Sequence, residues 1–451
     1  MEKRKPCVHF ISLGCPRNLV DSELMIGLLK DKGYTLTPRL NVADFVVINT
    51  CGFLEVARDE SIEVIQHVIA EKRPKTKIIV TGCMAQLKIP ELEKMKDEIH
   101  FIVGSGDVDQ IITALSAKER GSCITDKRSY LESIDDPRLL STPPHCAYLK
   151  IAEGCRKRCS YCIIPIIKGP LKSKSVDQIL AEVNVLLDKG VWEIILIAQD
   201  LGDWGKDLGS NRLTHLLKQI LTIERDFRLR LLYLYPDEID EDLISLMKKE
   251  KRILPYLDMP IQHINDDILK TMRRSTSKKQ ILQIVKTLHK EIPNISLRTS
   301  LMVGFPGETT EQFQELLDFV QTGIFSNIGI FAYSNETLCD SSSFSDQIEE
   351  DVKKERCEIL QKTQMAIVAE NNSQFVGKKL PVLIDGYHVE TDLLMTGRLP
   401  GQTPEIDSSV IINDHEHVDA FGETYFVEIT DVSDYDLVGK VVSKCKKDEW
   451  S

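Results

Sequence analysis

The strongest chemical signal in the sequence is a loop with three cysteines, Cys155, Cys159 and Cys162. This spacing lets three thiolates converge on one metal cluster, and iron–sulfur clusters are normally held by four cysteines. Because the loop supplies only three, one iron would keep an open position for a substrate or cofactor. The competing interpretation is a zinc site completed by a distant histidine, although no histidine lies in the loop.

Three further cysteines, Cys15, Cys51 and Cys83, each follow a short apolar run that is typical of a buried strand. The runs are residues 8–13, 45–49 and 77–81. Parallel strands of a doubly wound sheet bring their carboxyl ends to one edge, so we expect the three thiols to meet there as a second three-cysteine site. The alternative is that they are small buried hydrophobic side chains. The other six cysteines show no such arrangement, and we interpret them as structural; they are Cys7, Cys123, Cys146, Cys339, Cys357 and Cys445.

Strand and helix patterns alternate over two long stretches, which predicts an α/β fold. Residues 5–120 predict an N-terminal doubly wound parallel sheet that includes a helix over 107–119, and residues 121–140 predict a linker. Residues 141–372 contain six strand–helix units, which predict a partial (β/α) barrel with the Cys155 loop after its first strand. Residues 375–445 contain short β runs separated by Gly, Pro and Asp, which predict a small antiparallel barrel of about five strands.

The net charge of −12 is concentrated at one end of the chain. Residues 376–451 hold 7 basic and 15 acidic side chains. Polyphosphate is repelled by such a surface, so a basic protein is favoured over a nucleic acid as the partner of this end. No apolar run is long enough for a membrane helix, and the basic N-terminus is followed by only six apolar-rich residues, 8–13. We therefore expect a cytoplasmic protein with no membrane partner.

The pattern of the Cys155 loop is the signature of the radical S-adenosylmethionine (SAM) superfamily. With a second three-cysteine site and a terminal β-barrel, the whole chain resembles the methylthiotransferase family, in which that barrel is called the TRAM domain. The resemblance is closest to the branch of the family that modifies a ribosomal protein. It is carried by residues 11–18, 230–236, 304–308 and 397–407.

This resemblance implies two [4Fe–4S] clusters and two molecules of SAM. One SAM would methylate a sulfur at the site of Cys15, Cys51 and Cys83. The other would be cleaved at the catalytic Cys155/Cys159/Cys162 cluster to a 5′-deoxyadenosyl radical. The implied product is a methylthio group on the β-carbon of one aspartate of small-subunit ribosomal protein S12. That carbon has no useful acidity and no leaving group, so acid–base chemistry alone would not suffice.

The resemblance also implies which residues line the SAM site: Tyr161, Gln199, Gln262, Arg298 and Glu308. The sequence departs from the family pattern in two places. Lysines stand at 168, 172 and 174 where arginines are usual, and Lys lacks the planar fork of Arg. Residues 201–205 differ from the usual Thr-Thr and Tyr-Gly, so details of the substrate pocket are expected to differ.

Between Gly154 and Val176 the chain carries six basic residues and no acid: Arg156, Lys157, Arg158, Lys168, Lys172 and Lys174. Our hypothesis is that part of this run docks an acidic flavodoxin or ferredoxin as electron donor; the alternative is a solvated basic face. Two other functions stay open. The first is the same chemistry on tRNA, which would need a basic terminal barrel. The second is a non-enzymatic iron–sulfur factor in ribosome assembly or redox sensing, in which three-ligand clusters would have no purpose.

Overall fold

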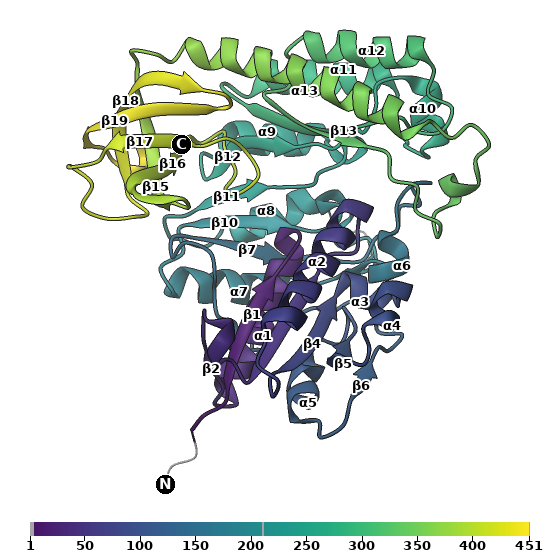
Figure 1. Cartoon of the computed structure of the whole chain (residues 1–451). Helices are drawn as coiled ribbons and strands as arrows, with labels where there is room; N and C mark the ends of the chain where they lie inside the picture. Colours follow the sequence, from purple (N-terminus) through teal and green to yellow (C-terminus); the bar gives the residue numbers. More distant parts are fainter. Residues whose placement is uncertain (1–3, 210–211, 451) are drawn as a thin grey trace.

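The N-terminal sheet is built from six parallel strands (Figure 1). The computed structural model describes residues 4–209 and 212–450; residues 1–3 of the basic N-terminus lie outside the described residues. All residues of the central strand β3 after Phe45 are buried, as expected for a parallel sheet covered by helices on both faces. The strand order is β2-β1-β3-β4-β5-β6. The strands are β1 (Cys7–Ser12), β2 (Thr35–Leu36), β3 (Phe45–Thr50), β4 (Lys77–Gly82), β5 (Ile99–Val103) and β6 (Gly121–Cys123).

Five helices and two short 3-10 segments connect these strands: α1 (Pro16–Asp31), η1 (Leu40–Val42), α2 (Glu55–Glu71), α3 (Cys83–Leu87), α4 (Pro90–Lys94), η2 (Val108–Gln110) and α5 (Ile111–Ser116). The helix expected over 107–119 is therefore shorter than predicted. It begins as the 3-10 turn η2 and stops at Ser116. Strand β6 pairs with β5 inside the stretch expected to be a linker.

The central part is an open sheet of six parallel strands, in the order β14-β13-β12-β11-β10-β7. The strands are β7 (Cys146–Lys150), β10 (Glu193–Ile197), β11 (Arg228–Leu231), β12 (Ile253–Asp258), β13 (Ser296–Val303) and β14 (Asn327–Ala332). A separate pair, β8 (Ala152–Glu153) and β9 (Lys172–Ser173), flanks the cysteine loop. This open sheet is the partial barrel predicted from the six strand–helix units of the sequence.

Helices cover the outside of this partial barrel (Figure 1). They are α7 (Val176–Asp188), α8 (Leu213–Ile220), α9 (Glu241–Lys249), α10 (Asp266–Thr271), α11 (Lys278–Glu291), α12 (Thr310–Gln321) and α13 (Glu350–Ser373). The short helix α6 (Ile164–Lys168) follows the cysteine loop and packs against α3 of the N-terminal part. Short 3-10 segments follow three of the strands: η3 (Leu201–Asp203), η4 (Pro236–Glu238) and η5 (Asp340–Ser343). Helices α7, α11 and α12 begin with reciprocal capping boxes, which fix where each helix starts.

The terminal part is a closed five-stranded barrel. It consists of β15 (Lys379–His388), β16 (Thr391–Arg398), β17 (Val410–Asp414), β18 (Thr424–Ser433) and β19 (Asp436–Lys444), followed by η6 (Lys447–Glu449). It departs from the expected antiparallel pattern at one pair, because β19 runs parallel to β17. Strand β18 runs antiparallel to β15, and β19 runs antiparallel to β18. Strand β19 therefore has the same direction as β17, so the pair that closes the barrel is parallel.

Helix α1 lies in the seam between the first sheet and the partial barrel. Its apolar side shares one core with Tyr148 of β7 and Ile195 of β10. On the same helix, the buried carboxylate of Asp21 accepts hydrogen bonds from Lys150 at 2.6 Å and Lys168 at 3.1 Å. These buried ion pairs join the two α/β units into one body.

In the parts of the chain that the structure describes, no helix combines the length and the apolar character needed to cross a bilayer.

The seam can be tested with Asp21→Asn. The substitution leaves two buried ammonium groups short of a carboxylate, so we expect a loss of about 3–5 kcal/mol in the free energy of unfolding. Urea denaturation followed by tryptophan fluorescence measures it. Asp31→Asn is the matched control, since Asp31 is on the same helix and its side chain is 59% exposed. A loss for Asp21→Asn no larger than for this control would contradict the role of the buried pairs.

Candidate active site

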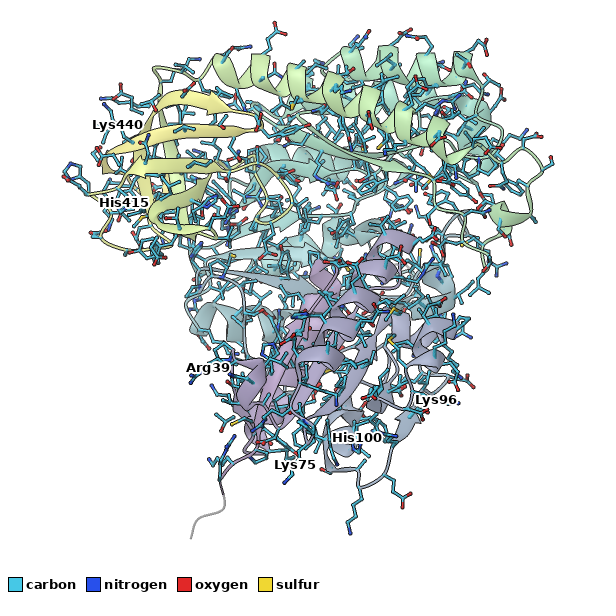
Figure 2. The ribbon with its side chains drawn as sticks, in the orientation of Figure 1. Arg39, Lys75, Lys96, His100, His415 and Lys440 are labelled. Atoms are coloured by element: carbon cyan, nitrogen blue, oxygen red, sulfur yellow. The ribbon has the colours of Figure 1, made fainter. Side chains whose placement is uncertain are left out.

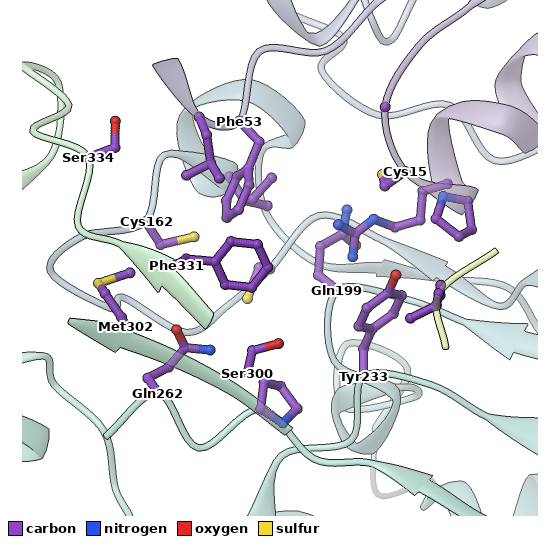
Figure 3. A pocket seen from close by; sticks show the side chains of 18 of the residues that line it. Cys15, Phe53, Cys162, Gln199, Tyr233, Gln262, Ser300, Met302, Phe331 and Ser334 are labelled. Carbon is purple, nitrogen blue, oxygen red and sulfur yellow. The ribbon is translucent and has the colours of Figure 1, made fainter. Parts of the chain in front are cut away.

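A cavity of about 980 Å³ lies where the three parts of the chain meet. Its wall takes Cys15 from the N-terminal part, Cys162 from the partial barrel and Glu405 from a loop of the terminal barrel. Figure 3 shows Cys15 and Cys162 on opposite sides of this space, with Gln199 and Tyr233 toward Cys15 and Gln262 and Met302 toward Cys162. Both predicted cysteine sites therefore open onto one cavity.

The ends of β1, β3 and β4 bring Cys15, Cys51 and Cys83 to one edge of the first sheet. These strands are adjacent, and the residues before Cys51 and Cys83, Thr50 and Gly82, are paired in register. Cys15 precedes α1, and Cys83 is the first residue of α3.

Two glycines let these three cysteine segments approach closely. A Cβ at Gly14 would lie 3.2 Å from Sγ of Cys51, and Gly14 has φ +92°. A Cβ at Gly52 would lie 2.8 Å from the carbonyl carbon of Cys83. A side chain at either position would push the segments apart, which is the physical reason for glycine there.

Cys155, Cys159 and Cys162 lie on a loop that is fixed by hydrogen bonds at both ends. The amide of Cys155 donates to the carbonyl of Gly169 at 3.2 Å, and Ser160 Oγ donates to the carbonyl of Thr271 at 2.9 Å. Cys155 and Cys162 line the cavity, whereas Cys159 is 8% exposed and lies behind it. Nη1 of Arg274 is 4.0 Å from Sγ of Cys159, so a cation faces this thiol.

Acidic residues behind the loop hold its basic side chains. Arg156 pairs with Asp203 at 2.9 Å, and Lys157 pairs with Asp200 at 2.9 Å. In the described ranges, Asp200, Asp203 and Glu238 are the only three His, Cys, Asp or Glu side chains with ligand atoms within 4.8 Å of one another. Since cationic side chains already pair with all three, this cluster anchors the loop.

Neither cysteine trio meets that 4.8 Å limit. Three thiolates on one tetrahedral zinc, with Zn–S bonds of about 2.3 Å, would be only about 3.8 Å apart. As the side chains stand, neither trio has the spacing of ligands on a single tetrahedral zinc ion.

Burial raises the pKa of several of these thiols. The pKa of Cys83 is raised to about 12 and that of Cys155 to about 11, in each case chiefly by desolvation. Lys168 acts in the opposite direction on Cys83, which places an ammonium group near that sulfur. At neutral pH these two thiols are protonated without metal, so metal binding must release protons.

Four of the five residues expected at the SAM site line the cavity: Tyr161, Gln199, Gln262 and Arg298. Nε2 of Gln199 donates to Glu153 at 2.5 Å, while its buried Oε1 has no protein partner. A buried acceptor without a donor suits a bound polar ligand. Arg298 is already paired, with Asp258 at 3.0 Å and with Asp407 of the terminal-barrel loop at 3.3 Å.

Glu308, the fifth residue, is not part of the cavity wall in the structure. Its carboxylate accepts from the amide of Gly304 at 2.8 Å and from Arg356 at 2.6 Å. These two contacts hold the turn after β13. The sequence motif correctly indicates a turn but does not reveal that Arg356 of α13 donates a hydrogen bond to the carboxylate of Glu308.

Three residues on the cavity wall adopt left-handed backbone conformations although none is glycine: Tyr233 (φ +62°), Gln262 (φ +72°) and Glu405 (φ +63°). Each such residue costs on the order of 1–3 kcal/mol, and such strain gathers at functional sites. For Gln262 the conformation is held by two strand contacts, its amide to Ser300 and its carbonyl to Met302. The wall is therefore pre-formed by the fold.

The basic run is not the continuous surface that the sequence suggested. Lys168 and Lys174 are buried and pair with acids, Lys168 with Asp21 and Lys174 with Glu132 and Glu182. Lys157 is held in the loop anchor, so Arg156, Arg158 and Lys172 are the members that are exposed. The pairing acids lie far away in sequence or in the next helix, and for that reason the sequence pattern did not reveal them.

The polar residues of the wall that sequence reasoning missed include Arg17, Tyr233 and Glu405. All three lie inside stretches that carry the family resemblance, namely 11–18, 230–236 and 397–407. Their position inside these stretches could have identified them as candidate site residues. Arg274, which faces Cys159, had no such signal.

Three family models match the chain in succession: "Uncharacterized protein family UPF0004" over residues 7–104, the radical SAM superfamily over 149–320 and the TRAM domain over 376–442. A relative from Protochlamydia amoebophila is 54% identical, with 98% of this chain and 95% of that protein covered; it is named ribosomal protein uS12 methylthiotransferase RimO. A protein of the same name from Citrifermentans bemidjiense is 41% identical, with 98% and 99% covered.

Among solved structures, a radical SAM methyltransferase, TsrM from Kitasatospora setae, matches with a TM-score of 0.53. The identity is 14%, and the match covers 73% of this chain and 72% of that one. At this identity the likeness concerns the fold alone.

The buried His263, next to Gln262, predicts that the free energy of unfolding falls in acid. Burial lowers its pKa to about 4, and its Nδ1 accepts from the amide of Asn265, so the ring is neutral. Because the unfolded chain takes up a proton near pH 6.5 and the folded one only near 4, the stability from neutral His263 is present above 6.5 and is lost toward pH 4. From pH 7 to 5 the loss is on the order of 2 kcal/mol.

The measurement is urea denaturation of the metal-free protein at several pH values. His263→Gln should flatten the stability profile between pH 7 and 5, whereas His67→Gln, at an exposed position, should leave it unchanged. An unaltered slope in His263→Gln would refute the assignment.

Proposed function

The chain belongs to the RimO family of ribosomal protein uS12 methylthiotransferases, and from that membership we propose how its residues divide the reaction. It is a radical SAM enzyme that transfers a sulfur-containing group. The radical SAM part implies one [4Fe–4S] cluster and SAM as cofactors. Cys155, Cys159 and Cys162 are the proposed ligands of this cluster, with Tyr161, Gln199, Gln262 and Arg298 around the bound SAM.

A second [4Fe–4S] cluster is proposed on Cys15, Cys51 and Cys83. The observation that carries the proposal is that two three-cysteine sites lie at one cavity, with Cys15 and Cys162 on its opposite sides. Three protein ligands leave one iron of each cluster open to a ligand from the cavity. The first site would hold the sulfur to be transferred, and the second would serve the radical chemistry.

The proposed substrate is one aspartate of uS12, modified at its β-carbon by a methylthio group. When bound, the cluster and SAM at the Cys155 site supply a radical that can remove hydrogen from this unactivated carbon. The chain's own residues would hold the reacting carbon in the cavity between the two sites. Since Cys15 and Cys155 line the same cavity, one bound side chain can reach both without leaving it.

We propose that the terminal barrel guides the basic substrate protein into the cavity. Its loop over 399–407 reaches the wall with Glu405 and Ile406. Within the described ranges, the exposed carboxylate of Glu405 takes part in no ion pair or hydrogen bond, so it is free to meet a cationic residue of the substrate. The surplus of acids in residues 376–451 favours a basic protein and disfavours tRNA.

An acidic flavodoxin or ferredoxin is the proposed electron donor. Its contact would be narrower than the sequence suggested, and it would use the exposed Arg156, Arg158 and Lys172 near the Cys155 loop. Electrostatic docking of this kind weakens as salt screens the charges.

Mass spectrometry of uS12 tests the proposed function. Cells with the wild-type gene should contain uS12 with one methylthio group on an aspartate, and Cys155→Ala should abolish the modification because a cluster ligand is lost. Cys357→Ala is the control, since this half-buried thiol on α13 donates to the carbonyl of Ile330 and is not part of the cavity wall, and it should leave the modification intact. Unmodified uS12 in the wild type would refute the function.

Iron content tests the second cluster. Anaerobically reconstituted protein should hold about eight irons, and Cys15→Ala should hold about four. Cys123→Ala, on strand β6 outside the cavity, should retain the wild-type content. About four irons in the wild type would mean that the protein holds one cluster and would contradict the second.

A further inference from the structure

One cation on the cavity wall, Arg17, makes no close ion pair with any of the residues that the structure describes, although the carboxylate of Glu153 is near enough to act on it electrostatically. Its Nη1 donates to the carbonyl of Ala198 at 2.9 Å, and its guanidinium lies 5.2 Å from the ring centre of Tyr233. The other arginine on the wall, Arg298, is matched by Asp258 and Asp407. Arg17 is therefore held in place while part of its hydrogen-bonding capacity stays open to the cavity.

Arg17 stands at the junction of the two proposed cluster sites. It follows Cys15 by two residues in the first turn of α1. Ala198, which accepts its hydrogen bond, directly follows β10 and directly precedes Gln199 of the proposed SAM site. The guanidinium thus crosses the seam from the sulfur side of the cavity to the SAM side.

We propose that Arg17 binds the side-chain carboxylate of the substrate aspartate and thereby positions its β-carbon between the two sites; this inference rests on the proposed function. The β-carbon is bonded directly to that carboxylate, so holding one fixes the other. The planar fork of arginine matches a carboxylate with two parallel hydrogen bonds. A cation left unpaired in a partly desolvated wall gains from an anionic ligand.

The same arrangement predicts selectivity. An asparagine side chain has the same shape as aspartate but is neutral and presents an amide nitrogen, which cannot accept from the guanidinium. The cavity should therefore discriminate aspartate from asparagine through Arg17. Two other anions could bind Arg17 instead: the carboxylate of SAM and a sulfur species held at Cys15. Each of these would make a different measured property depend on Arg17.

The experiment uses the reconstituted full-length enzyme and two peptides that copy the modified segment of uS12, one with the target aspartate and one with asparagine. Fluorescence anisotropy measures peptide affinity, and mass spectrometry measures kcat and KM. The wild type should bind the aspartate peptide about 10- to 100-fold more tightly than the asparagine peptide. Arg17→Gln should bring the two affinities within about twofold and raise KM for the aspartate peptide. Arg17→Lys should keep an intermediate preference, because an ammonium retains the charge without the fork.

Iron content and binding of radiolabelled SAM are measured on the same samples. They should equal those of the wild type in both variants, and in Arg39→Gln, the control on an exposed part of the same domain (Figure 2). Arg39→Gln should also keep the full preference for aspartate.

A full aspartate preference in Arg17→Gln would overturn the proposal. If Arg17→Gln lost SAM binding, the proposal would be overturned, and Arg17 would instead bind the carboxylate of SAM. If this variant lost iron or cluster-bound sulfur, the proposal would also be overturned, and Arg17 would instead bind the sulfur species at the Cys15 site. If the wild type binds the aspartate peptide selectively but does not modify it, the proposed function fails while the role of Arg17 stands.

Discussion

The arrangement depends on one buried carboxylate, that of Asp21, which is shared by Lys150 and Lys168. Lys150 ends β7, just before the Cys155 loop, and Lys168 ends α6, just after it. Asp21 lies on α1, whose N-terminus is Cys15. Burial opposes ionisation of the neighbouring Glu153, yet Lys168 and Lys150 hold its pKa at about 2, so the network stays charged. These ion pairs fix the two cysteine sites relative to each other.

Around this fixed seam the cavity is assembled from parts that cannot form it alone. The loop of the terminal barrel reaches Arg298 through Asp407 and contributes Glu405 to the wall. Tyr233, Gln262 and Glu405 keep strained backbone conformations, and backbone hydrogen bonds to Ser300 and Met302 maintain that of Gln262. A pre-formed wall of this kind limits where a substrate carbon can sit, and this restriction matters for radical chemistry, because an unconstrained radical would react with whatever lies nearest.

Much of this could be predicted from the sequence. The meeting of Cys15, Cys51 and Cys83 follows from parallel-strand topology, because adjacent strands end at one edge. What failed were inferences about charge and side-chain direction. Lys168 and Lys174 appeared to be part of a surface run, but their partners Asp21 and Glu132 are separated from them by more than forty positions in the sequence. Glu308 lies in the expected turn, but the sequence did not reveal its partner Arg356, and Arg17 was not singled out although it lies inside a recognised motif.

The central claim is that two iron–sulfur sites, each with three cysteines, face one cavity across the seam. The most direct measurement is a crystal structure of the anaerobically reconstituted protein with iron located by anomalous scattering. The account predicts two iron centres, one at the sulfur atoms of Cys15, Cys51 and Cys83 and one at those of Cys155, Cys159 and Cys162, both bordering the cavity. A single iron centre, with the first three sulfur atoms directed apart, would contradict it.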